Sequence, residues 1–201
     1  MTRTSDSGTG REQRPRTFIE QARRAQLLDV TIGLVAEHGY AGTSLARIAA
    51  GAGITKAAVL YHFPSKEAVV VAARNQVLGG MARHVGEAVE AVGAEEAPGA
   101  YVRSMIGYLR DNPRQTRMIV EALGGTGDRP DRAMRRQPLA EILAAAREAR
   151  GLSGVLDFRT LAVVTGGSID AVVSEHLADP GYDTAAAADL LVGMLERSLF
   201  A

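Results

Sequence analysis

Cysteine is absent from this sequence of 201 residues, and so is tryptophan. Without cysteine there is no disulfide framework, no thiolate nucleophile and no zinc site with cysteine ligands, which is compatible with a reducing cytoplasm. No run of 18 apolar residues occurs, and the polar, arginine-bearing N-terminus lacks the apolar core of a signal peptide. We therefore expect a soluble, cytoplasmic protein with no membrane partner.

Net charge is also lacking, because 23 Lys and Arg balance 23 Asp and Glu. A neutral chain by itself argues against nucleic-acid binding, but the charges are unevenly placed. Residues 1–66 carry nine Lys and Arg against five Asp and Glu, and the rest of the chain carries 14 against 18. A basic head on an acidic body is typical of a protein that touches phosphate with one end only.

Known catalytic motifs are missing as well. The sequence contains no H-E-x-x-H, G-x-S-x-G, G-x-x-x-x-G-K-[ST] or G-x-G-x-x-G arrangement. The glycine-rich stretch 124–127 has no predicted strand before it and no lysine after it, which argues against a phosphate loop. The four histidines have no ligand spacing among them. We expect no metal, no cofactor and no enzymatic activity.

The stretch 43–66, TSLARIAAGAGITKAAVLYHFPSK, is the most informative part of the chain. Short apolar-periodic segments alternate with residues that cap, turn or end a helix, which are Thr43, Ser44, Gly53, Thr55, Pro64 and Ser65. Two short helices joined by a glycine turn make a helix-turn-helix, whose second helix can enter a DNA major groove. The pattern therefore predicts a DNA-binding motif.

The motif and its surroundings share a set of marks, which are Gly39-Tyr40, Thr43-Ser44, Ile48-Ala49, Gly53-Ile54-Thr55-Lys56, Tyr61-His62-Phe63 and Ser65-Lys66-Glu67. With these marks the sequence closely resembles the N-terminal DNA-binding domain of the TetR family of bacterial transcriptional regulators. The resemblance is dense over residues 24–72 and thin after that. Two departures concern DNA affinity and operator sequence: Leu60 stands where the family usually has an aromatic residue, and Ala57 replaces a common glycine.

Helical periodicity continues to the C-terminus without an alternating strand pattern, so the sequence predicts an all-α protein of about nine helices. Residues 1–16 are expected to form a disordered arm, whose arginines lie either in solvent or against DNA. Residues 17–64 are expected to form a three-helix DNA-binding domain. The resemblance implies that residues 65–201 form a helical ligand-binding and dimerisation domain.

Helix boundaries follow from glycine, proline and capping residues. The first helix is expected to end at Gly39, and the fourth to run to about Val92 with a hinge at Gly79-Gly80. Pro138 is expected to kink or restart its helix. Loops are predicted at 94–99 and 124–130. Caps of later helices are predicted at Asp131, at Asp157 and at either Asp183 or Thr184.

Candidate DNA contacts lie on the helix-turn-helix and just after it: Ser44, Arg47, Thr55, Lys56, Ala57, Ala58, Tyr61, His62 and Lys66. N-terminal residues of a recognition helix meet base edges, and helix N-termini and basic side chains grip phosphate. The resemblance implies that Lys56 contacts phosphate or a base and that Tyr61 and His62 contact the DNA backbone. Two alternatives stay open: Tyr61 and His62 pack against neighbouring helices, and Arg47 is a solvated surface charge.

Candidate ligand contacts are mainly apolar: Met105, Tyr108, Leu109, Met118, Ile119, Ala122, Leu123, Leu139, Leu143, Phe158, Leu161 and Ala162. Methionine and aliphatic side chains suit an apolar ligand, and the alternative for each residue is an ordinary place in the core. Apolar stripes around Val164–Val173 and Leu190–Leu195 suggest a partner surface with two-fold symmetry.

The resemblance implies a regulator, most often a repressor, that binds a palindromic double-stranded operator as a homodimer through its last two helices. A small, largely apolar effector would release it from DNA. The alternative from a different class is a helical small-molecule-binding or interaction protein of the same fold without specific DNA binding.

Overall fold

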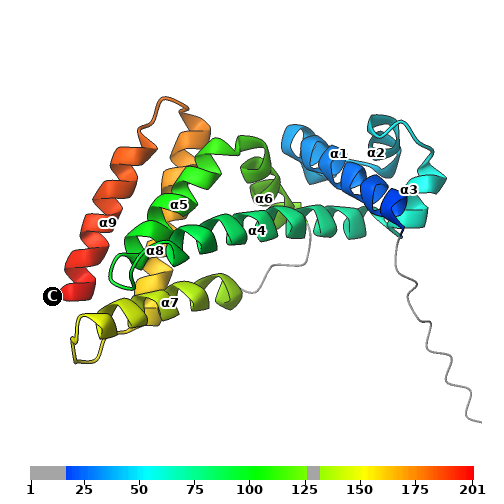
Figure 1. The fold of residues 1–201 in the computed structure, drawn as a ribbon. Helices are drawn as coiled ribbons and strands as arrows, with labels where there is room; N and C mark the ends of the chain where they lie inside the picture. The colour runs from blue at the N-terminus through cyan, green and yellow to red at the C-terminus, as the bar shows by residue number, and fades with distance from the viewer. Residues whose placement is uncertain (1–16, 126–131) are drawn as a thin grey trace, which may run out of the picture.

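The computed structural model describes residues 17–125 and 132–201, with side chains described outside 123–125 and 132–135. Within these ranges the chain forms nine helices and no strand, so the predicted all-α class is confirmed. Figure 1 shows an elongated arrangement, with α1–α3 at one end and α8 and α9 at the other. The helices are α1 Phe18–Gly42, α2 Leu45–Gly51, α3 Lys56–His62, α4 Lys66–Glu90, α5 Ala97–Asp111, α6 Pro113–Gly125, α7 Arg132–Ala149, α8 Phe158–Ala178 and α9 Thr184–Phe200. The predicted arm, residues 1–16, lies outside the described residues.

Side-chain caps set the boundaries of the helix-turn-helix. Ser44, Thr55 and Ser65 have extended backbone, and each hydroxyl accepts a bond from the N–H three residues later, at 3.2, 3.2 and 3.0 Å. Gly53, in the turn between α2 and α3, has a φ of +65°, which glycine adopts without steric cost. The predicted helix-turn-helix is confirmed in these details.

α1 is interrupted near its C-terminal end. Gly39 has φ +69° and ψ 174°, and a further turn then extends to Gly42. The predicted helix end at Gly39 is therefore a break followed by a short turn. A β-carbon at Gly39 would lie 3.0 Å from Oε2 of Glu121 in α6. Both the positive φ and this close approach favour glycine.

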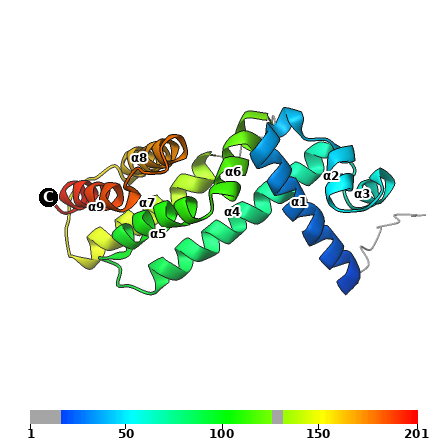
Figure 2. The same ribbon diagram turned by 90° about the horizontal axis from the view of Figure 1, so that it is seen from above.

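α4 connects the two ends of the molecule, packing against α1 and α6 as well as α5 (Figure 2). It is a continuous helix through Gly79 and Gly80 and ends at Glu90, close to the predicted Val92. A β-carbon at Gly80 would lie 3.2 Å from the hydroxyl of Tyr108, so this glycine allows α5 to approach closely. The packing accounts for Gly80, and the hinge stays a prediction.

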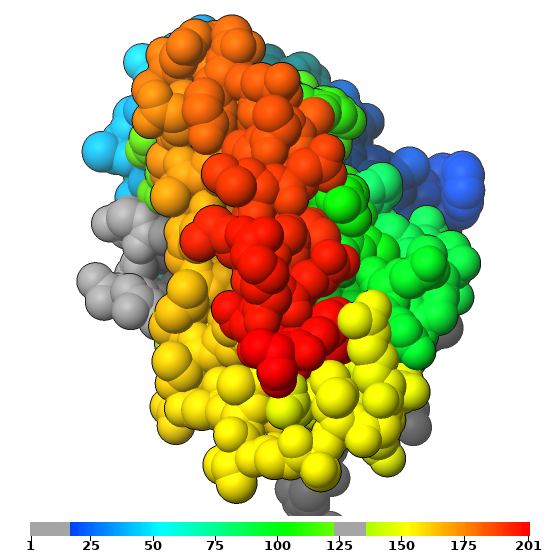
Figure 3. All heavy atoms as spheres, turned by 90° about the vertical axis from the view of Figure 1, so that its left-hand side faces the viewer, coloured from blue at the N-terminus to red at the C-terminus, as the bar shows by residue number. Residues whose placement is uncertain are grey.

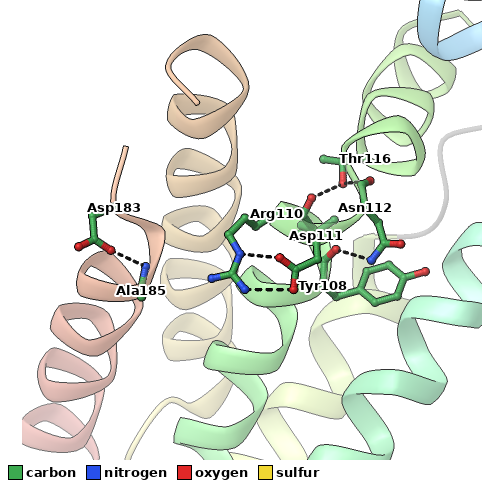
Figure 4. A network of polar contacts seen from close by, with 8 residues as sticks. Tyr108, Arg110, Asp111, Asn112, Thr116, Asp183 and Ala185 are labelled. Carbon is green, nitrogen blue, oxygen red and sulfur yellow. Dashed lines mark hydrogen bonds and ion pairs between the residues drawn. The ribbon is translucent and has the colours of Figure 1, made fainter. Parts of the chain in front are cut away.

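Side chains fix the sharp change of direction between α5 and α6 (Figure 4). The amide of Asn112 donates to the Tyr108 carbonyl at 2.8 Å, and the buried hydroxyl of Thr116 donates to the Leu109 carbonyl at 2.8 Å. The Thr116 bond satisfies the Leu109 carbonyl, whose helical partner would be the N–H that Pro113 lacks. The Asn112 amide adds a second bond to the Tyr108 carbonyl, which already accepts the Asn112 N–H at 3.0 Å. Pro113 begins α6 as predicted, because its missing N–H costs nothing in a first turn.

Several predicted boundaries in the second half need correction. The expected loop 94–99 is too long, because α5 begins at Ala97 with a proline in its first turn. Residues 124 and 125 end α6 instead of starting a loop, and residues 126–131, including Asp131, lie outside the described residues. α7 contains Pro138 and runs as one helix, with that ring on its exposed side. Asp157 and Asp183 cap α8 and α9 as predicted.

α5 is the central helix of the C-terminal half and contacts α4, α6, α7, α8 and α9. Val102 and Ile106 are almost fully buried on it, and each such aliphatic side chain contributes about 1.5–3 kcal/mol when removed from water. One apolar core extends from α1 through α4 and α5 to α9. Among the described helices, none combines the length and apolar character needed to cross a membrane.

Candidate nucleic-acid interface

α3 presents a narrow exposed face at its N-terminal end. Lys56 and Ala57 are exposed and Ala58 is half-buried, whereas Val59 is fully buried and anchors the helix. The Thr55 hydroxyl is occupied by the cap of α3, where it accepts from the Ala58 N–H. A positive side chain beside two methyl groups, at the positive end of a helix, fits the edge of a DNA groove.

Ser44 and Arg47 lie at the start of α2 and take part in the junction with α1. The Ser44 hydroxyl accepts from the Arg47 N–H, and Nη1 of Arg47 donates to the Gly42 carbonyl at 2.6 Å. Arg47 remains exposed, so its guanidinium has further donors directed to solvent. The structure thus explains both residues locally, and their contact with phosphate stays a prediction.

Tyr61 is 74% exposed near the end of α3, and its hydroxyl donates to Oε1 of Glu20 at 3.1 Å. This exposure disfavours the predicted alternative, in which Tyr61 packs against neighbouring helices. Bonds from the Thr17 N–H and from Tyr61 lower the pKa of Glu20, and this carboxylate raises the pKa of Tyr61. Glu20 also completes the capping box of α1 with Thr17.

His62 is half-buried, with its ring edge-on to Tyr61 at a centroid distance of 5.1 Å. Its carbonyl accepts from Nη1 of Arg24 at 2.8 Å, and the same guanidinium lies 3.9 Å from the ring centre of Phe63. Arg24 therefore fastens the end of α3 to α1. Sequence analysis missed this residue, because the bond joins positions 38 residues apart.

Lys66, in the first turn of α4, is half-buried. Its Nζ lies 3.9 Å from the ring centre of Tyr40 in α1. A cation over an aromatic face is attracted by the ring quadrupole, so Tyr40 restrains the lysine side chain. Tyr40 was a mark of the resemblance, but its contact with Lys66 was not predicted.

α1 is consequently the support of the whole candidate interface. It holds Tyr61 through Glu20, the end of α3 through Arg24, and Lys66 through Tyr40. Leu60, the departure noted in the sequence, is 41% exposed beside these residues. The arrangement is a small basic surface with a single carboxylate at the contact with Tyr61.

The candidate ligand residues come together in the core between α5, α6, α7 and α8. Most are buried: Met105, Leu109, Met118, Ile119, Ala122, Leu139, Leu143 and Ala162. Tyr108, Phe158 and Leu161 are half-buried against this core. Leu123 lies outside the residues whose side chains are described. This burial is that of ordinary core residues, and contact of these residues with a ligand stays a prediction.

An open groove of about 600 Å³ lies between α1 and α6. Its apolar wall includes Val30, Leu34 and Pro113, and the exposed side chains of Arg114 and Arg117 lie at its rim. The groove lies where α1 and α6 pack against each other. It was not predicted, because its two walls come from distant parts of the sequence.

α8 and α9 form one continuous face at the far end from α3 (Figure 3). Val164, Leu190 and Met194 expose 58%, 65% and 52% of their surface on these helices. At Gly166 and Gly167 a β-carbon would meet no atom within 4 Å. An apolar face with small residues is typical of a surface that a partner helix covers.

Comparison with known proteins agrees with the domain at the N-terminal end. The family model described as "Bacterial regulatory proteins, tetR family" matches residues 27–73. The HTH-type transcriptional regulator RutR of Escherichia coli strain K12 is 30% identical over 126 residues, which are 62% of this chain. The match covers 58% of RutR, little more than half of its length.

Solved structures extend the likeness to the whole fold. A proposed transcriptional regulator from Pseudomonas aeruginosa PAO1 superposes with a TM-score of 0.76 at 21% identity, covering 92% of this chain and 94% of that one. FadR from Bacillus subtilis, solved in complex with stearoyl-CoA, gives a TM-score of 0.67 at 20% identity, covering 85% and 96%. The solved structures show a shared fold, and the helix-turn-helix geometry with the family match places residues 27–73 of this chain in the TetR family of bacterial regulatory proteins.

Proposed function

We propose that this chain is a transcriptional repressor that binds a palindromic operator as a homodimer and leaves it when a small, largely apolar molecule binds. The observation that carries the proposal is the exposed end of α3, where Lys56 and Ala57 face solvent while Val59 anchors the helix. A recognition helix must be held rigidly and must carry small or basic residues at its N-terminal end. α1 holds α3 and the start of α4 in position through its contacts with Tyr61, Phe63 and Lys66.

A homodimer follows from the requirement for two half-sites. One α3 covers only a few base pairs, whereas two recognition helices about one helical turn apart reach the affinity of specific regulators. The exposed apolar face of α8 and α9 supports pairing at the end opposite the DNA-binding domain. A two-fold axis through that face would present both α3 helices on the same side.

The proposed effector is apolar because the core between α5 and α8 is built from methionine and aliphatic residues. The B. subtilis neighbour binds stearoyl-CoA, a ligand with a long apolar chain, in the same overall fold. α4 connects the proposed effector site to the proposed DNA-binding surface, because its first turn carries Lys66 and its remainder packs on α5. A 100-fold loss of operator affinity requires the effector to prefer the released shape by about 2.7 kcal/mol.

Selection of binding sites from random duplexes at about 150 mM salt tests the proposal directly. The full chain is mixed with the duplex pool, and the recovered sequences are read. We expect an enriched palindrome and a homodimer in light scattering. A folded dimer that enriches no sequence would contradict specific DNA binding.

The second candidate function is a ligand-binding protein of this fold without specific DNA binding. Leu60 favours it, because an exposed leucine stands where an aromatic residue would face the DNA backbone and cannot donate to phosphate. The two candidates differ in salt dependence. A regulator with several phosphate contacts loses affinity steeply as salt rises, and a steep salt dependence would count against the alternative without specific DNA binding.

A further inference from the structure

One carboxylate meets the surface proposed to face DNA. Glu20, in the first turn of α1, accepts the hydroxyl of Tyr61 at 3.1 Å and the N–H of Thr17 at 2.9 Å. Tyr61 itself is 74% exposed, so its hydroxyl reaches toward this acid although solvent surrounds it. The contact joins α1 to α3 at positions 41 residues apart.

The two hydrogen bonds use different oxygens of Glu20, because the Thr17 N–H donates to Oε2 and the Tyr61 hydroxyl donates to Oε1. A glutamine has one acceptor oxygen, so it could complete the capping box or accept from Tyr61. The carboxylate supplies both acceptors, together with a negative charge beside the residues that would approach phosphate. The bonds from Thr17 and Tyr61 also keep Glu20 ionised, since they lower its pKa.

Tyr61 has one hydroxyl proton to donate. In the free protein this proton goes to Glu20, so a phosphate that takes the same donor leaves the carboxylate with one bond fewer. The phosphate also brings a second negative charge to within a few ångströms of the first, and like charges at that distance repel. Each duplex that docks on α3 meets this opposition, whatever its sequence.

We propose that Glu20 limits DNA affinity: by holding the Tyr61 hydroxyl and opposing phosphate, it weakens the sequence-independent attraction of DNA to α3. The inference rests on the proposed DNA binding. Phosphate contacts are common to operator and random duplexes, so Glu20 lowers the affinity for both, and a random duplex reports this effect without a contribution from base contacts.

The test compares Glu20→Gln with wild type on a random-sequence duplex of about 30 base pairs, by fluorescence anisotropy over a salt series. Glutamine removes the charge and keeps one acceptor oxygen, which can maintain either the capping box or the bond from Tyr61. We expect affinity to rise about threefold to tenfold near 50 mM salt, with the difference shrinking toward 300 mM as screening increases. Circular dichroism melting verifies that the variant folds.

The matched control is Glu90→Gln, which makes the same charge change on an exposed residue at the far end of α4. We expect it to bind as wild type does. If the affinity for the duplex rises equally in both variants, the effect is due to the total charge of the protein and the proposal is overturned. A weaker Glu20→Gln complex also overturns it, because the carboxylate would then be helping Tyr61.

Failure of the proposed function gives a different result. In that case folded wild-type protein enriches no sequence in the site selection, whether or not Glu20→Gln changes the affinity for a random duplex. When wild-type protein binds with a steep salt dependence, the comparison of Glu20→Gln with Glu90→Gln alone decides the role of the carboxylate.

Discussion

The guanidinium of Arg114 lies directly on the backbone of Gly33: a β-carbon at Gly33 would be only 1.9 Å from Nη2 of Arg114. The same group donates to the Asp29 carbonyl at 3.3 Å. Arg114 belongs to the first turn of α6 and Gly33 to the middle of α1. This contact therefore joins the C-terminal half to the helix that supports the candidate DNA interface.

The first prediction is that Gly33→Ala and Arg114→Ala are coupled in stability. Alanine favours a helix over glycine by about 1 kcal/mol, but at position 33 its methyl must displace the guanidinium. We expect Gly33→Ala alone to raise the free energy of unfolding only slightly. Once Arg114 is truncated, the same substitution should give the full increase of about 1 kcal/mol. A double-mutant cycle in urea should give a coupling of about 0.5–1.5 kcal/mol.

Gly86→Ala serves as the control for that cycle. It lies in α4, where a β-carbon would meet no atom within 4 Å. Its gain should be the same with or without Arg114→Ala, because distant sites add. Additive behaviour at Gly33 as well would show that the close contact has no energetic weight.

The second prediction concerns the restraint of Lys66 by Tyr40. Losing a cation–π contact at a half-exposed site costs about 0.5–1 kcal/mol. We expect Tyr40→Leu to weaken duplex binding about threefold to fivefold, whereas Tyr40→Phe, which keeps the ring, stays within about twofold. Anisotropy titration with the same duplex measures both variants. Equal losses for leucine and phenylalanine would assign the effect to the hydroxyl instead of the ring.

Sequence patterns predicted the order and most ends of the helices, because those depend on nearby residues. Ser44, Thr55, Ser65, Asp157 and Asp183 cap helices as expected, since a cap needs only the N–H groups two or three residues ahead. The errors came where tertiary packing overrides a local signal. Proline and glycine after Ala97 start α5 instead of ending a loop, and Pro138 lies inside α7.

The candidate site was predicted only as far as its exposed residues. The residues that hold it in place, Glu20, Arg24 and Tyr40, act across 41, 38 and 26 positions of the chain. No periodicity or motif connects such distant side chains, so their contacts depend on how α1 packs behind α3 and α4. The Arg114–Gly33 contact could not be predicted from the sequence for the same reason.

The third prediction is that Lys56→Ala weakens operator binding by about 1–3 kcal/mol. Lys56 is the first residue of α3 and is exposed, so its ammonium is free to approach a base edge or phosphate. The control is Arg159→Ala, which removes a positive charge from an exposed residue of α8. Unchanged operator affinity in Lys56→Ala would remove this lysine from the site.

The fourth prediction is a pH dependence of stability at the start of α8. Asp157 accepts the Thr160 hydroxyl at 2.6 Å and its N–H at 3.0 Å, and these bonds lower the pKa of the carboxyl. The folded-state pKa then lies below the unfolded one of about 3.9. Its stabilising contribution is complete above that value and is lost as pH falls through the folded pKa.

Asp157→Asn isolates this effect, because asparagine caps a helix as well as aspartate but does not titrate. We expect the thermal midpoint of the wild type to fall more steeply than that of Asp157→Asn as pH decreases from about 5 to 2. Scanning calorimetry across that range measures the difference. Parallel curves for the two proteins would mean that the carboxylate is no better bonded in the folded state than in water.

The fifth prediction tests the proposed partner surface. Leu190 and Met194 are exposed on α9, as Val164 is on α8, and pairing through these two helices would bury them against a second copy. Met194→Glu would then place an unpaired carboxylate in an apolar interface, which costs several kcal/mol. We expect at least about a tenfold weaker dimer in sedimentation equilibrium, together with weaker operator binding, because one subunit carries only one α3. Val120→Glu is the matched control, since Val120 is also exposed, at 53%, but lies on α6 away from that face. If Met194→Glu stays as dimeric as Val120→Glu, the two copies pair through another surface, and the half-site spacing must be derived from that surface instead.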